Sequence, residues 1–68
     1  MITDSALRYR AAKYGLQLIK RGDNYTVIDI YINGVVHGPG LTAEAVDEFL
    51  GWMDALDALP EVLAEASN

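Results

Sequence analysis

The first apolar pattern of the chain has the period of an α-helix. Over residues 5–14, apolar side chains recur at i, i+4 and i+7, while basic side chains take the other positions. This spacing predicts a helix with one apolar face. Thr3 or Asp4 can cap its start, because a side-chain oxygen can accept a hydrogen bond from a free amide of the first turn. Gly15 can end it, since glycine readily takes the positive φ found after many helices.

The pattern then changes to residues that favour β-strands. Residues 16–21 and 25–32 are mainly aliphatic and aromatic, and the turn-forming residues 22–24 separate them. β-Branched and aromatic side chains are enriched in strands, so these two segments predict an antiparallel pair.

A second hairpin follows. Asn33-Gly34 predicts a type I′ turn, because both central residues of that turn need a positive φ. Residues 35–37 then form a short third strand. Gly38-Pro39-Gly40 should end this strand, because proline lacks an amide hydrogen and glycine weakens strand pairing.

Helical spacing returns in the last third of the chain. Thr42 is a suitable N-cap for a helix from residue 43 to about residue 59. Its apolar stripe consists of Val46, Phe49, Leu50 and Met53, widened by Ala45, Trp52 and Leu56. Pro60 is expected to stop or kink this helix, because its ring would clash with a carbonyl of the preceding turn.

The element order α-β-β-β-α predicts an α+β fold, in which a three-stranded antiparallel sheet carries both helices on one face. The 68 residues suffice for one domain, which we place at residues 1–59, with a short C-terminal tail at 60–68. The chain has no cysteine, so disulfides cannot stabilise it. A domain of this size is marginally stable alone, which makes a partner subunit valuable.

The alternation of side chains predicts which residues share a face of the sheet. A three-residue loop at 22–24 would place Ile19 opposite Val27, whereas a two-residue loop would place Leu16 opposite Asp29 and mix apolar with charged positions. The three-residue loop is therefore preferred. The predicted core face then consists of Leu16, Leu18, Ile28, Ile30, Ile32 and Val35.

The opposite face of the sheet should remain uncovered, although it is partly apolar. Exposed apolar patches commonly mark interfaces. The predicted interface residues are Ile19, Tyr25, Val27, Tyr31 and Val36, together with Trp52 of the second helix. Isolated β-branched residues on a solvated face are the simpler alternative.

Charge is divided unevenly along the chain. The net charge is −5, but residues 1–21 contain all five basic residues and carry +4, whereas residues 22–68 carry −9. The overall charge disfavours nonspecific binding to nucleic acid or to an anionic membrane. A basic patch formed by the first helix and first strand could nevertheless contact phosphates, and its members would be Arg8, Arg10, Lys13, Lys20 and Arg21.

Few residues could support catalysis. His37 is the single histidine, and neither a metal-ligand cluster nor a glycine-rich phosphate loop is present in the sequence. We therefore expect no enzymatic activity, no catalytic residue, no metal and no cofactor. The N-terminus lacks the pattern of a secretory signal, and no apolar run approaches the roughly 18 residues of a membrane span. These features predict a cytoplasmic protein that does not bind membranes.

Part of the chain resembles a known group of small proteins. The similarity runs from residue 6 to residue 50 and includes the segments Ala11–Lys20, Tyr25–Asp29 and Val35–Gly38, with Leu41-Thr42 and the apolar positions that follow. These segments resemble small uncharacterised proteins common in actinobacteria and their phages. That group has no established activity, so the resemblance implies an accessory protein of phage or mobile-element origin and assigns no catalytic residue.

The leading hypothesis is a non-enzymatic protein-interaction module that self-associates as a homodimer or binds another protein. One alternative is a nucleic-acid-binding regulator that uses the basic first helix. Another is an acidic inhibitor of a host protein, whose acidic stripe would consist of Asp47, Asp54, Asp57, Glu61 and Glu65.

Overall fold

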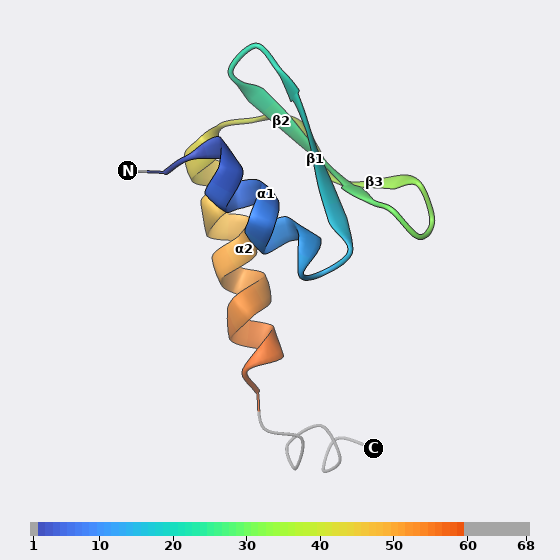
Figure 1. Ribbon diagram of the computed structural model, residues 1–68, viewed down its shortest axis with the longest axis vertical. Helices are drawn as coiled ribbons and strands as arrows, with labels where there is room; N and C mark the ends of the chain where they lie inside the picture. The colour runs from blue at the N-terminus through green and yellow to red at the C-terminus, as the bar shows by residue number, and fades with distance from the viewer. Residues whose placement is uncertain (1, 60–68) are drawn as a thin grey trace.

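The computed structural model describes residues 2–59 and has the predicted element order (Figure 1). The elements are α1 (Asp4–Ala12), β1 (Leu16–Arg21), β2 (Asn24–Asp29), β3 (Gly34–Leu41) and α2 (Ala43–Asp57). The strands form one antiparallel sheet in the order β1-β2-β3, and both helices cover the same face. The predicted α+β fold is confirmed. The tail at 60–68, including the expected break at Pro60 and the end of the acidic stripe, lies outside the described residues.

The ends of α1 follow local rules. Thr3, rather than Asp4, is the N-cap, and its hydroxyl accepts a hydrogen bond from the amide of Ala6 at 3.2 Å. Gly15 follows the helix with a φ of +71°, a conformation that glycine adopts without the strain imposed by a Cβ. α1 buries Leu7 and Ala11, as its apolar spacing predicted.

The turn between β1 and β2 corrects the predicted register. It contains two residues, Gly22 and Asp23, so Arg21 pairs with Asn24 and Leu18 pairs with Val27. The predicted three-residue loop is wrong. Gly22 has a φ of +61°, and a glycine at the first central position is what a tight type II′ turn requires.

This shorter turn moves β2 by one residue relative to β1 and exchanges its two faces. Tyr25 and Val27, predicted to lie on the uncovered face, are buried beneath the helices. Four predicted core residues lie outside the core: Ile28 is half-buried, and Ile30, Ile32 and Val35 are exposed. The observed core consists of Leu7, Ala11, Leu16, Leu18, Tyr25, Val27, Val46 and Leu50.

The turn between β2 and β3 also differs from the prediction. β2 ends at Asp29, which pairs directly with Gly34, so the connection has four residues instead of two. The carboxylate of Asp29 accepts hydrogen bonds from the amides of Tyr31 at 2.9 Å and Ile32 at 3.4 Å. Asn33 takes a φ of +52°, whereas Gly34 does not take a positive φ. The type I′ turn at Asn33-Gly34 is therefore replaced by a turn that the Asp29 side chain organises.

β3 continues through the segment expected to end it. Its pairing with β2 shifts register twice, and Leu41 pairs with Tyr25 beyond the irregularity. Gly38, at a φ of +92°, permits a close approach of the two backbones, since a Cβ there would lie 3.0 Å from the carbonyl oxygen of Tyr25. The Gly-Pro-Gly segment therefore distorts the strand without terminating it.

Each of the two edge strands has a feature that limits pairing with a further strand. On the β1 side, the guanidinium of Arg8 donates a hydrogen bond to the carbonyl of Leu18 at 2.7 Å. On the β3 side, Pro39 has no amide hydrogen to offer.

α2 begins as predicted and extends beyond the sheet. Thr42 is its N-cap and accepts a hydrogen bond from the amide of Ala45 at 3.1 Å. Its first half buries Val46 and Leu50, whereas its second half runs past the end of α1 and away from the strands (Figure 1).

Candidate interaction surfaces

A polar network joins α1 to α2. Arg10 of α1 forms ion pairs with Asp47 and Asp54 of α2, and Lys13 lies 3.6 Å from the carboxylate of Asp54. The hydroxyl of Tyr14 donates a hydrogen bond to the same carboxylate. This hydrogen bond is the main reason that the pKa of Asp54 lies below its usual value, with Lys13 and Arg10 acting in the same direction.

A second network joins the start of α1 to the sheet. The carboxylate of Asp4 accepts hydrogen bonds from Arg8 at 2.7 Å and from the hydroxyl of Tyr25 at 2.9 Å. Both bonds lower the pKa of Asp4, that from Arg8 most strongly. The buried Tyr25 ring thus keeps a polar contact at its tip, which explains how a tyrosine can occupy a core position.

These networks use most of the basic residues that were candidates for nucleic-acid binding. Arg8, Arg10 and Lys13 each contact at least one carboxylate of their own chain. Arg8 is turned toward β1, whereas Arg10 is turned toward α2. The remaining two form no ion pair within residues 2–59: the ammonium of Lys20 is 5.9 Å from the Tyr25 ring centre, and Arg21 is exposed beside the first turn.

The opposite end of the sheet carries exposed apolar side chains. We define the hairpin tip as residues 30–36, the loop and adjacent part of β3 that project away from the helices (Figure 1). Five of its seven residues are large and apolar, with exposed fractions from 46% for Val36 to 84% for Tyr31. The tip contains no charged residue. The edge of the Tyr31 ring lies against the backbone of Gly15, which leaves most of the ring open to solvent.

The hairpin tip continues onto the uncovered face of the sheet. Ile28 pairs with Val35 and with Gln17 on this face, and Ile19 pairs with Thr26. Ile19 is exposed and Ile28 is half-buried. The sequence therefore led to an uncovered, partly apolar face, but the register error assigned several of the wrong residues to it.

The six predicted interface residues divide accordingly. Tyr25 and Val27 are buried and are removed from the candidate interface. The others are exposed, at Ile19 on β1, Tyr31 and Val36 in the hairpin tip, and Trp52 on α2.

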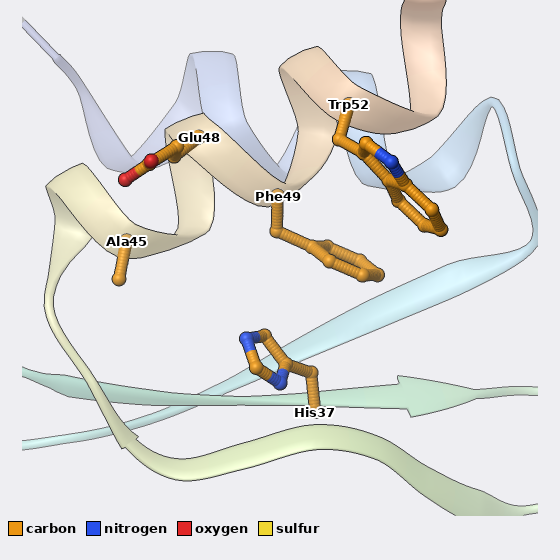
Figure 2. A pocket seen from close by; sticks show the side chains of 5 residues that line it. All are labelled: His37, Ala45, Glu48, Phe49 and Trp52. Carbon is orange, nitrogen blue, oxygen red and sulfur yellow. The ribbon is translucent and has the colours of Figure 1, made fainter. Parts of the chain in front are cut away.

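Trp52 belongs to a separate groove between α2 and β3. Figure 2 shows His37 rising from β3 toward Phe49, with Trp52 farther along the same side of α2. The rings of His37 and Phe49 are 5.1 Å apart between centroids, and those of Phe49 and Trp52 are 6.2 Å apart. The groove has a volume of about 370 Å³, and Ala45 and Glu48 complete its lining. Sequence reasoning missed this groove because it assigned Phe49 to the core stripe alone.

The groove is suited to apolar contact and lacks a visible arrangement for acid–base chemistry. Its titratable side chains are His37 and Glu48, and the Glu48 carboxylate points away from the imidazole in Figure 2. No cluster of three or more histidine, aspartate or glutamate residues that could hold a metal occurs within residues 2–59. Over the same range, no helix has the length and apolar character needed to cross a membrane.

The similarity to small actinobacterial and phage proteins stays a prediction. Comparison of the chain with protein-family models, with curated proteins and with solved structures gave no match.

Proposed function

We propose that this protein is a non-enzymatic interaction module that self-associates through its hairpin tip. The observation that carries the proposal is the uncharged run of residues 30–36, in which five large apolar side chains are exposed. The largest apolar patch on the surface of a soluble protein is often a functional contact site.

The apolar area of the hairpin tip is of the size that a dimer needs. Full burial removes about 60–120 Å² of apolar surface for an aliphatic side chain and about 150–250 Å² for an aromatic one. Scaled by their exposed fractions, the five side chains offer about 270–490 Å². A standard interface buries about 800 Å² per partner, of which about 450 Å² is apolar. The tip supplies much of this area, and Ile19 and Ile28 extend it.

A second copy of the chain is the partner that best fits this surface. In a two-fold dimer the same patch meets itself, so a patch that carried charges of one sign would face like charges. The hairpin tip has no charge and is therefore self-compatible. Burial of the hairpin tip in a dimer would add substantially to the stability of a domain that buries little surface by itself.

Sedimentation equilibrium at micromolar concentrations tests the proposal with two matched variants. Tyr31 and Tyr9 are exposed by 84% and 81%, but Tyr9 lies on α1, away from the tip. The wild type should dimerise, Tyr31→Glu should be monomeric, and Tyr9→Glu should behave as the wild type. Ile32→Glu provides a second tip variant without the ring contact at Gly15. A wild type that stays monomeric across the concentration range contradicts self-association.

Binding of nucleic acid through the first helix is less well supported. Three of its five candidate residues already contact carboxylates of the same chain, and a phosphate would have to compete with those contacts. A mobility-shift assay at low salt checks this alternative.

A further inference from the structure

α2 carries two neighbouring apolar stripes: one faces the core, and the other is largely exposed, although its first residue, Phe49, also packs against the core. The inner stripe contains the buried Val46 and Leu50 and the half-buried Met53. A second stripe, which we call the outer seam, follows a spacing of three, four and three residues. It consists of Phe49, Trp52 and Leu56 of α2, followed by Leu59 just beyond the end of the helix.

The outer seam is largely open to solvent. Trp52, Leu56 and Leu59 are exposed by 45–59%, and the half-buried Phe49 connects them to the groove beside His37. Within α2, the three-four spacing of Phe49, Trp52 and Leu56 is that of the a and d positions along which one helix packs against another. An extended strand has no such period, so the outer seam is shaped for a partner helix.

The charges around the outer seam are all negative. α2 contains five acidic residues and no basic one. Asp47 and Asp54 are occupied by α1, whereas Glu44, Glu48 and Asp57 form no ion pair within residues 2–59. Glu48 borders the groove directly. A helix that lies along the seam would therefore bring its flanking residues close to free carboxylates.

A second α2 is a poor occupant for this reason. Every lysine and arginine of the chain lies within residues 1–21, so α2 paired with its own copy would place acidic residues beside acidic residues. Like charges placed opposite each other suppress a pairing. The complementary occupant carries leucine-like side chains on one face and lysine or arginine beside them.

We propose that the outer seam of α2 binds a basic amphipathic helix of another protein. The apolar side chains of that helix would pack on Trp52 and Leu56 and enter the groove at Phe49. Its basic side chains would approach Glu48, which borders the groove. This binding surface is separate from the hairpin tip and does not depend on self-association.

A synthetic helix tests the proposal directly. The probe is a peptide of about three heptads with leucine at a and d and lysine at the flanking positions, and its counterpart carries glutamate in place of lysine. Trp52 is the single tryptophan of the chain, so its emission reports on the seam alone. The lysine peptide should shift this emission to shorter wavelength in a saturable manner, and added salt should weaken binding. The glutamate peptide should cause no shift.

Two variants of equal charge separate a defined site from general attraction between an acidic protein and a basic peptide. Leu56→Asp and Tyr9→Asp each add one negative charge, the first within the seam and the second on α1. General attraction predicts that both bind as tightly as the wild type or more tightly. The outer seam predicts at least about tenfold weaker binding for Leu56→Asp alone, a loss typical of a removed interface anchor. Leu59→Asp should repeat this loss, and circular dichroism should show all three variants folded.

Three results would overturn the proposal. The first is equal affinity of Leu56→Asp and Tyr9→Asp for the lysine peptide. The second is a shift of the oligomeric state of Leu56→Asp to monomer, which would identify a second copy as the occupant. The third is loss of peptide binding in Tyr31→Glu, which would place the site at the hairpin tip. If the wild type is monomeric but the peptide binds as expected, the function proposed for the tip fails while the outer seam stands.

Discussion

The contact between the two helices and the hairpin tip use their side chains in opposite ways. Between α1 and α2, charged groups meet partners of the same chain: Arg10 binds Asp47 and Asp54, and Asp54 also accepts from Tyr14. At the hairpin tip, apolar side chains face solvent and meet few partners. The charged groups between α1 and α2 therefore have partners within the chain, whereas the apolar side chains of the hairpin tip are exposed to solvent.

This difference changes the meaning of the uneven charge distribution. From the sequence alone, the basic first segment was a candidate for contact with phosphates. In the structure, Arg10 and Lys13 from the basic segment meet Asp54 from the acidic one. Charge asymmetry along a chain can thus serve contacts within the molecule. The surfaces that remain for partners are the exposed apolar ones and the carboxylates of α2 that form no ion pair within residues 2–59.

The largest expected effect comes from placing one negative charge in the core, compared with the same charge placed in the hairpin tip. Val27 is fully buried, whereas Ile32 in the hairpin tip is 75% exposed. Val27→Asp would bury a carboxylate without a partner, at a cost of several kcal/mol, against a total stability of roughly 3–5 kcal/mol for a domain this small. We expect Val27→Asp to be unfolded by circular dichroism.

Ile32→Asp is the matched control. It should remain folded and melt within about 4 °C of the wild-type monomer, as surface substitutions usually do. The opposite outcome, a folded Val27→Asp and an unfolded Ile32→Asp, would restore the three-residue loop and the face assignment that depends on it.

Two glycines provide a comparison of intermediate size. Gly15 has a φ of +71°, and a Cβ there would lie 2.5 Å from the Tyr31 ring, whereas Gly34 has no positive φ and faces only the flexible end of Ile32. Gly15→Ala should cost about 1–2 kcal/mol, because the left-handed region disfavours a Cβ. We expect its melting temperature to fall by about 5–15 °C, with little change for Gly34→Ala. An equal fall in melting temperature for Gly15→Ala and Gly34→Ala would favour the type I′ turn at Asn33-Gly34.

The smallest expected effect is the change in stability of the contact between α1 and α2 at acidic pH. The pKa of Asp54 is lowered chiefly by the Tyr14 hydroxyl, so this carboxylate stabilises the fold above its unfolded pKa of about 3.9. That contribution is lost as pH falls through the lower, folded value. Asp54→Asn should therefore lower the melting temperature at pH 6 and reduce its decline between pH 6 and pH 3. Asp23→Asn, in the turn between β1 and β2, should retain the wild-type dependence of melting temperature on pH. If Asp54→Asn shows the same dependence as Asp23→Asn, the role of this network is refuted.

Local features of the sequence predicted the helices and the order of elements. The apolar period located both helices, Thr42 capped α2, and Gly15 took the positive φ expected after α1. Each of these depends on residues close together in the chain. The candidate surface at Tyr31 also followed from the sequence, because an exposed position was expected there and is observed.

The assignment of faces failed because it depended on a single residue of loop length. Gly22 permits a two-residue turn, and the carboxylate of Asp29 holds a four-residue one. Neither choice follows from apolar alternation, since Ile28 and Val27 are equally apolar neighbours on opposite faces. The hydroxyl of the buried Tyr25 finds its acceptor in Asp4, which is distant in the sequence. The spacing of the outer seam is visible in the sequence. The prediction assigned its residues to the core stripe, because the sequence does not show that α2 runs past the sheet.

The features of the two edge strands have a consequence for fibril formation. A hairpin rich in isoleucine, valine and tyrosine with no charge has the composition of segments that stack into cross-β fibrils. Such growth needs an unbroken row of free backbone groups on an edge strand. Arg8 occupies a carbonyl on the β1 edge, while Pro39 and two register shifts interrupt β3. The fold can therefore expose an apolar hairpin while both edge strands lack an unbroken row of free backbone groups.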